Sequence, residues 1–175
     1  MESVNNNNNY VNVIDNVIDN DNDNDMISLA QDVSALLPQY ENATLPGFLL
    51  GINHLAKKYN KLRKVRGDGN CFYRAFFFGY LECLLLKYKE ETQKKSANIE
   101  RERILDIIIN SKNELIEYGY NEIAFESFYD IVIEVLENLF TYTLDELLES
   151  FQATGLSDYY TWYMRLLTSL NMNLW

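Results

Sequence analysis

One short segment of the sequence carries residue types that could do covalent chemistry, VRGDGNCFYRAF at residues 65–76. The glycines and asparagine before Cys71 allow backbone conformations with positive φ, and the apolar residues after it predict a helix that begins at the cysteine. Unpaired N–H groups and the positive end of the helix dipole at such a terminus favour thiolate over thiol. The same N–H groups, in the turn from Asp68 to Cys71, could stabilise an oxyanion when the thiolate attacks a carbonyl. The segment therefore predicts a nucleophile and an oxyanion hole in one loop.

Cys71 also has a simpler interpretation, because free cysteines often act as small buried hydrophobes and Gly-Asp-Gly-Asn is an ordinary turn. A cysteine nucleophile normally uses a histidine as general base and general acid. The sequence contains one histidine, His54, which lies 17 positions before Cys71 among the apolar residues of a predicted helix. A solvated histidine, or one at the edge of the core, is the usual case at such a position. A Cys71–His54 dyad is therefore the minor alternative.

The residues DGNCFYRAF resemble the nucleophile motif of the otubains, a branch of the ovarian-tumour family of cysteine deubiquitinases. The preceding PGFLLGINHLAKKYNKLRKVR is similar to the otubain helix that leads into this motif, and SDYYTWYMRLLTS at residues 157–169 resembles a second otubain segment. By this resemblance Cys71 is the nucleophile, and Asp68 is the aspartate whose backbone helps line the oxyanion hole. The resemblance, which spans residues 26–170, also implies an α+β cysteine protease fold without metal or cofactor.

The resemblance implies a function as well, namely hydrolysis of ubiquitin conjugates at the C-terminal glycine of ubiquitin through a thioester intermediate. Ubiquitin or polyubiquitin is then a partner, a ubiquitin-conjugating enzyme is a further partner, and the expected location is the cytoplasm and the nucleus. An otubain continues after the segment at 157–169 with strands of the central sheet and the catalytic histidine, which this sequence lacks. We therefore expect a truncated otubain-like domain with weak or no activity by itself. A non-catalytic binding module of the ubiquitin pathway is the alternative.

The spacing of apolar residues predicts helices along most of the chain, because they recur every three or four positions. The predicted helices cover residues 26–37, the stretch after Pro46, and residues 71–92, 98–118 and 121–140. Thr143 and Glu146 then form a capping box for a helix that Gly155 ends, and Ser157 caps the last helix. No segment alternates with a period of two, so we expect a predominantly α-helical portion without strands, from which the sheet-forming C-terminal part is missing. We expect Cys83 to pack in the core.

Composition limits the classes of protein to which the chain can belong. Its 175 residues suit one domain. Two cysteines without CxxC spacing predict neither a disulfide framework nor a zinc site. The sequence shows no signal peptide and no apolar run long enough to cross a membrane, so we expect a soluble protein without membrane contact. The net charge of −11 is concentrated in residues 1–56, which hold eight acidic residues and no Lys or Arg.

Two polar stretches could suggest other functions. Residues 1–25 contain ten Asn and five Asp, which predicts a disordered tail ahead of a domain at 26–175. A calcium site is disfavoured there, because an EF-hand loop needs a Gly at its sixth position and a Glu at its twelfth. Residues 57–74 hold seven of the 15 basic residues. Single-strand binders combine such charge with exposed aromatic residues, and within this stretch Tyr59 is the only aromatic residue before the motif. We therefore expect a solvated helix face or a surface that meets acidic partners, and no nucleic-acid partner.

Overall fold

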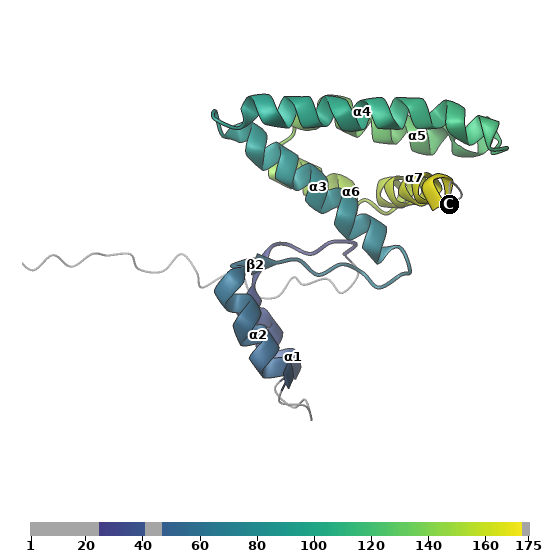
Figure 1. Cartoon of the computed structure of the whole chain (residues 1–175). Coiled ribbons are helices and arrows are strands. Elements are labelled where there is room, and N and C mark those ends of the chain that lie inside the picture. Colours follow the sequence, from purple (N-terminus) through teal and green to yellow (C-terminus); the bar gives the residue numbers. More distant parts are fainter. Residues whose placement is uncertain (1–24, 41–46, 173–175) are drawn as a thin grey trace, which may run out of the picture.

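The computed structural model describes residues 25–40 and 47–172 of the chain (Figure 1). The predicted tail at residues 1–25 lies outside the described residues except for Asp25. In the described part, helices dominate, as the sequence predicts, and a small antiparallel ribbon is added to them. No helix in these two ranges is both long enough and apolar enough to cross a membrane.

The main body is a bundle of helices that pack around one apolar core. It consists of α3 (Cys71–Lys89), α4 (Lys94–Glu117), α5 (Glu122–Asn138), the short 3-10 turn η2 (Leu139–Thr141), α6 (Leu144–Gln152) and α7 (Thr154–Met172). Helices α4 and α5 run side by side along the top of Figure 1, while α3 packs on α4, α6 and α7. Each helix contributes fully buried apolar side chains: Leu81 and Leu85, Ile108 and Leu115, Val132 and Leu136, Leu147 and Phe151, and Tyr163. Burial of this face, more than intrinsic helix propensity, holds the helices in place.

Local sequence signals account for several helix ends. The Thr143 hydroxyl accepts a hydrogen bond from the Glu146 N–H, and the Glu146 carboxylate accepts one from the Thr143 N–H, so the predicted capping box is confirmed. Helix α4 ends at Glu117, and two residues later Gly119 has a φ of 100°, which is strained for any residue with a Cβ. There the Tyr120 N–H donates to the carbonyl of Leu115, in the 6→1 pattern that closes many helices.

The predicted junction between the last two helices is wrong in detail. Helix α6 already ends at Gln152, and α7 begins at Thr154, so Gly155 lies in the first turn of α7 instead of ending α6. Ser157 lies inside α7 and is fully buried, so it is not a cap. Its hydroxyl has a partner from another helix, which is described below.

The N-terminal part contains the largest departure from the sequence prediction, because residues 26–32 are extended instead of helical. Strand β1 (Gln31–Asp32) pairs antiparallel with β2 (Lys61–Leu62), and Ile27 forms an isolated bridge with Val65. Ile27 is fully buried against the body. Pairing with a distant segment and burial in the body therefore override the helical spacing of these residues.

Two short elements and one longer helix complete the N-terminal part. A 3-10 turn, η1 (Val33–Leu36), is capped by Asp32 and leads into α1 (Leu37–Tyr40), which includes Pro38 instead of ending before it. A proline fits there because an N–H in the first turn has no acceptor within the helix. The predicted helix after Pro46 is confirmed as α2 (Gly47–Lys58), which lies below the main body in Figure 1.

The two cysteines both lie on α3, and both are exposed. The prediction that Cys83 packs in the core is wrong, although its neighbours Leu81 and Leu84 are buried as expected. Cys83 lines an open hollow between α3 and α4, with Tyr80 and Lys87 of α3 on one side and Ser96 and Glu100 of α4 on the other. Because α3 is apolar on most of its sides, the sequence alone could not indicate which side faces solvent.

Candidate functional site

Cys71 is the first residue of α3, as the sequence predicts. The Arg74 N–H donates to the Asn70 carbonyl at 3.0 Å and forms the first bond of the helix. Gly69, at φ 84°, lies in the bend two residues before this helix, in a conformation that favours glycine. The thiol is exposed, so the interpretation of Cys71 as a buried hydrophobe is wrong. The N–H groups of this first turn, including that of Cys71, have no acceptor within the helix and remain available to an oxyanion.

The Asp68 side chain organises the turn before the nucleophile. Its Oδ1 accepts a hydrogen bond from the Asn70 N–H at 2.9 Å, which closes a small loop around Gly69. The Asp68 N–H donates to the carbonyl of Arg66 at 3.1 Å, within the same turn. The oxyanion role of the Asp68 backbone stays a prediction, and the structure adds a second role for this residue through its carboxylate.

Arg74 is a fully buried arginine that connects this turn to α7. Its Nε donates to Ser157 Oγ at 2.8 Å, its Nη1 donates to Asp68 Oδ1 at 3.0 Å, and its Nη2 lies 2.9 Å from Asp68 Oδ2. Asp158 adds a weaker contact to Nη2 at 3.4 Å. The hydrogen bond from Arg74 holds the pKa of the Asp68 carboxyl below its usual range. Two carboxylates therefore compensate one buried guanidinium.

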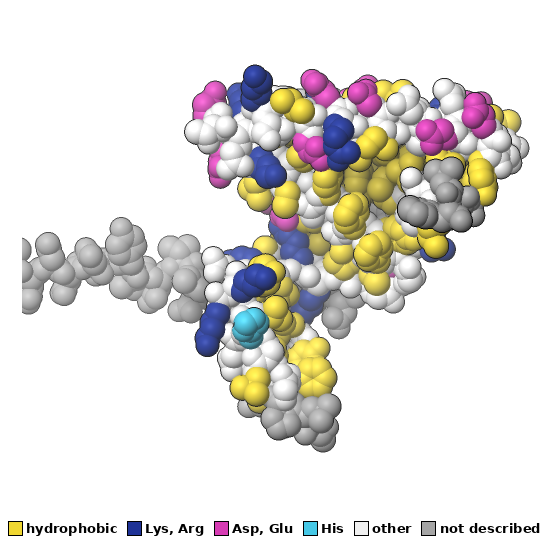
Figure 2. Space-filling view, in the orientation of Figure 1, with side chains coloured by type: hydrophobic (Ala, Val, Ile, Leu, Met, Phe, Trp, Pro, Cys, Tyr) yellow, Lys and Arg dark blue, Asp and Glu magenta, His cyan; other side chains and the backbone are white. Residues whose placement is uncertain are grey.

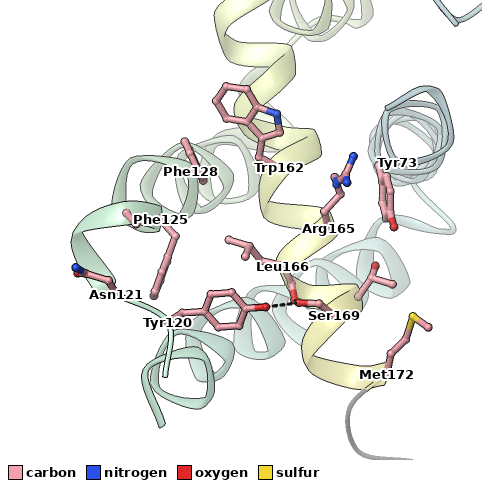
Figure 3. A pocket seen from close by; sticks show the side chains of 12 residues that line it. Tyr73, Tyr120, Asn121, Phe125, Phe128, Trp162, Arg165, Leu166, Ser169 and Met172 are labelled. Carbon is pink, nitrogen blue, oxygen red and sulfur yellow. Dashed lines mark hydrogen bonds between the residues drawn. The ribbon is translucent and has the colours of Figure 1, made fainter. Parts of the chain in front are cut away.

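Arg165 reaches the turn from a later part of α7. Its Nη1 donates to Asn70 Oδ1 at 3.0 Å, and its guanidinium carbon lies 5.9 Å from the centre of the Tyr73 ring. Figure 3 shows Arg165 pointing from α7 toward Tyr73 at the side of an open cavity. Arg165 and Tyr73 thus belong both to the surroundings of the nucleophile turn and to the wall of that cavity.

The cavity has a volume of about 460 Å³ and lies between α5, α7 and the start of α3. Its walls are mainly apolar, with Phe125 and Phe128 from α5 and Trp162 and Leu166 from α7 (Figure 3). A hydrogen bond of 3.0 Å between the hydroxyls of Tyr120 and Ser169 closes its lower end. An open apolar cavity whose wall includes Tyr73, two residues after Cys71 on the same helix, is a suitable place for part of a substrate or partner.

The structure does not bring His54 together with Cys71. His54 is exposed on α2, and Figure 2 shows it on the surface of the lower part of the molecule. Helix α2 packs on η1 and α1, and no hydrogen bond joins His54 to Cys71 in the part of the chain that the structure describes. The geometry therefore gives no support to a Cys71–His54 dyad.

The basic residues between 57 and 74 do not form one free surface. Arg74 is buried, and Arg63 forms an ion pair of 2.8 Å with Glu82 and lies over the Phe78 ring. Arg63 also donates to the carbonyl of Ser28 and so holds the N-terminal ribbon against α3. Part of the apparent basic run is thus internal structure.

Three residues of the site could not be assigned from the sequence: Ser157, Asp158 and Arg165. All lie in the segment at 157–169 that resembles an otubain sequence, which is the only signal that could have drawn attention to them. The sequence pattern placed Arg74 among the basic residues of the 57–74 stretch, which were expected at the surface. Their roles depend on contacts between residues 83 to 95 positions apart, which no local pattern shows.

The fold and the site define a class of protein, a helical domain that presents an exposed cysteine at a helix start behind a glycine turn. The family model described as Peptidase C65 Otubain matches residues 19–174, and the chain belongs to this family. It is 40% identical over 119 residues to human ubiquitin thioesterase OTUB1, a match that covers 67% of this chain and 40% of that protein. It is 31% identical over 144 residues to ovarian tumor domain-containing deubiquitinating enzyme 1 of Arabidopsis thaliana, over 79% of this chain and 44% of that protein.

Solved structures of the same kind are similar to this fold. A complex of ceOTUB1 with ubiquitin aldehyde and UBC13~Ub matches with a TM-score of 0.71 and 28% sequence identity, over 83% of this chain and 56% of that chain. A related complex of h/ceOTUB1 with ubiquitin aldehyde and UBCH5B~Ub matches with a TM-score of 0.70. The chain spans less than half the length of the two curated relatives named above.

Proposed function

We propose that this protein is a cysteine-type ubiquitin thioesterase and isopeptidase, in which Cys71 attacks the carbonyl of the C-terminal glycine of ubiquitin. The observation that carries this proposal is the exposed Cys71 at the start of α3, in a chain that belongs to the otubain family. The ubiquitin thioesterases among its relatives support the choice of substrate.

In the acylation step, the Cys71 sulfur forms a bond to the carbonyl carbon, and the electron pair of the C=O bond moves to oxygen. The free N–H groups at the start of α3 stabilise this oxyanion. The carbonyl then reforms, the bond to the leaving amine breaks, and the amine takes up a proton. Water hydrolyses the resulting thioester, releases the ubiquitin carboxylate and restores the thiol.

Protonation of the leaving amine limits what these 175 residues can do alone. A histidine normally transfers this proton, and the one histidine of the sequence, His54, lies on α2 without a hydrogen bond to Cys71. Loss of such a partner lowers the rate by several orders of magnitude, about 10⁶ when the histidine of a serine protease is removed. We therefore expect the 175-residue chain to form a covalent adduct with a ubiquitin electrophile but to cleave diubiquitin negligibly.

Mass spectrometry of the chain after incubation with ubiquitin vinyl sulfone tests the first part of this proposal. We expect one ubiquitin per chain, no adduct with Cys71→Ala, and an unchanged adduct with Cys83→Ala. Cys83 is the matched control because it is an exposed cysteine of the same helix. An adduct that persists in Cys71→Ala, or no adduct with the wild-type chain, would overturn the assignment of the nucleophile.

A gel assay of diubiquitin cleavage tests the second part. We expect negligible cleavage by the chain and by His54→Ala, and cleavage that depends on Cys71 when the histidine-bearing part of an otubain is fused to the chain. Efficient cleavage by the chain that disappears in His54→Ala would show a real dyad. A fusion that folds and stays inactive would contradict the enzymatic proposal.

A non-catalytic function is the second candidate, and one observation favours it: the similar solved structures are complexes that contain UBC13~Ub or UBCH5B~Ub as well as ubiquitin aldehyde. In this alternative the chain holds ubiquitin or a ubiquitin-conjugating enzyme without hydrolysis. Calorimetry would then detect binding of unmodified ubiquitin or of the conjugating enzyme, equal for the wild type and Cys71→Ala, while the wild type forms no adduct. For both candidates we propose location in the cytoplasm and the nucleus, which imaging of a fluorescently tagged chain tests.

A further inference from the structure

We propose that a polar cluster formed by Arg74, Ser157, Asp158 and Arg165 positions the nucleophile turn, so that its N–H groups face the carbonyl attacked by Cys71. These are positioning residues, because they act through Asp68 and Asn70 and do not touch the reacting atoms. The proposal rests on the proposed function and assigns a role to the start and middle of α7.

The guanidinium of Arg74 is the centre of this cluster. Its side chain is 0% exposed, and burial of a charge is costly unless the charge is paired and hydrogen-bonded. Ser157, Asp68 and Asp158 together provide acceptors for Nε, Nη1 and Nη2. The contacts are thus complete enough to fix the guanidinium plane relative to both α3 and α7.

The position of Arg74 is transmitted to the backbone through one carboxylate. Asp68 accepts from Arg74 through both of its oxygens, and its Oδ1 also accepts from the Asn70 N–H. The peptide plane between Gly69 and Asn70 therefore follows the Asp68 side chain. The next peptide, between Asn70 and Cys71, carries the Cys71 N–H, so the direction of that N–H depends on this plane and on the backbone of Asn70.

Arg165 holds the same turn from its other side. It donates to the side-chain oxygen of Asn70 at 3.0 Å, while Arg74 holds Asp68. The two arginines thus fix the residues on either side of Gly69, the one residue of the turn with positive φ. A glycine has many accessible conformations, so contacts on both sides are needed to keep this turn in one of them.

The packing of α3 against α7 does not depend on this cluster. Phe77 of α3 and Tyr160 of α7 have ring centres 5.8 Å apart, and Phe151 of α6 contacts both rings. Apolar contacts of this kind hold the helices together. Loss of a charged group at the exposed edge of the cluster should therefore loosen the turn while the helical body stays folded.

Two conservative substitutions test the proposal without removing the buried guanidinium. Arg165→Gln removes the contact to Asn70, and Asp158→Asn removes one of the two negative charges near Arg74. Arg103→Gln is the matched control, because Arg103 is a partly exposed arginine whose carboxylate partner, Glu100, lies on α4. Thermal unfolding confirms that each variant is folded.

Three measurements are made on each variant: the affinity for ubiquitin aldehyde, the rate of Cys71 alkylation by iodoacetamide, and hydrogen exchange of the amides at residues 68–72. In the aldehyde adduct the sulfur bonds to the carbonyl carbon and the carbonyl oxygen takes the thiol proton, so no leaving group is involved. That oxygen occupies the oxyanion site, whereas alkylation by iodoacetamide does not need it. We expect both test variants to bind the aldehyde roughly tenfold more weakly. Hydrogen exchange of the amides at residues 68–72 should be faster in both test variants, and the rate of Cys71 alkylation should change by less than about twofold. Arg103→Gln should behave as the wild type in all three measurements.

The outcomes separate the two proposals. If the wild type does not bind ubiquitin aldehyde, the proposed function fails, and hydrogen exchange alone decides the positioning role: faster exchange supports it and unchanged exchange overturns it. If the wild type binds and the variants bind equally well, the positioning role is wrong and the proposed function stands. Weaker binding with unchanged exchange would show that Arg165 or Asp158 contacts ubiquitin directly, which also overturns the positioning role. An equal loss of affinity for ubiquitin aldehyde in Arg103→Gln would also overturn the positioning role.

Discussion

Tyr163 and Ser111 form a buried hydrogen bond that connects α7 to α4, and the two ends of this bond should differ in their importance for stability. The hydroxyl oxygens are 2.7 Å apart, and Tyr163 and Ser111 are 0% and 3% exposed. Ser111 donates its own proton to the carbonyl of Ile108 at 2.7 Å. Tyr163 is therefore the donor to Ser111, and Ser111 Oγ is its acceptor.

The magnitudes follow from what each substitution leaves behind. Tyr163→Phe removes the donor, but Ser111 keeps its bond to Ile108, so we expect a loss of about 1 kcal/mol in the free energy of unfolding. Ser111→Ala leaves the buried Tyr163 hydroxyl without an acceptor, so we expect a loss of about 2 kcal/mol. The variant that carries both substitutions has no unsatisfied hydroxyl, so its loss in the free energy of unfolding should be close to that of Tyr163→Phe alone.

Urea unfolding of the four chains, followed by circular dichroism, measures these differences. Tyr159→Phe is the control, because Tyr159 is a half-buried residue of the same helix whose hydroxyl has no hydrogen bond to any described residue. Its substitution should change stability by less than about 0.5 kcal/mol. Losses that simply add in the double variant, or a larger loss for Tyr163→Phe than for Ser111→Ala, would refute the assignment of donor and acceptor.

Three further predictions concern the N-terminus, a helix cap and alkaline pH. Deletion of residues 1–24 should leave the melting temperature unchanged. Deletion of residues 1–27, which removes the buried Ile27, should lower the free energy of unfolding by at least about 2 kcal/mol. Thermal scans of both shortened chains check this. Thr143→Ala should cost about 1 kcal/mol in urea unfolding and Thr143→Ser much less, and equal losses would contradict the capping role. Burial raises the pKa of Tyr160 and of Tyr163 to about 12, above the ordinary value of 10. Because the fold favours the neutral phenols, their contribution to the free energy of unfolding is complete below pH 10 and is lost as the pH rises toward 12. A free energy of unfolding that stays constant across that pH range would contradict this prediction.

The sequence determined the features that depend on neighbouring residues. The spacing of apolar residues located the helices from Cys71 to Asn138, and Thr143 with Glu146 located the start of α6. The turn before Cys71 was also predictable, because a glycine conformation and a helix start are local properties. Within such segments the chain contacts itself over three or four positions, and the pattern of residue types records those contacts.

Only the tertiary structure decided which side chains surround Cys71 and the turn before it. Ile27 is extended because it pairs with Val65, and Cys83 is exposed because α3 and α4 leave an open hollow beside it. Arg74 is buried because Ser157 and both of its carboxylate partners meet it there. These outcomes depend on contacts between segments tens of residues apart. The free energy of such contacts comes from burial and charge compensation in the folded chain, which the spacing of residues along the sequence does not record.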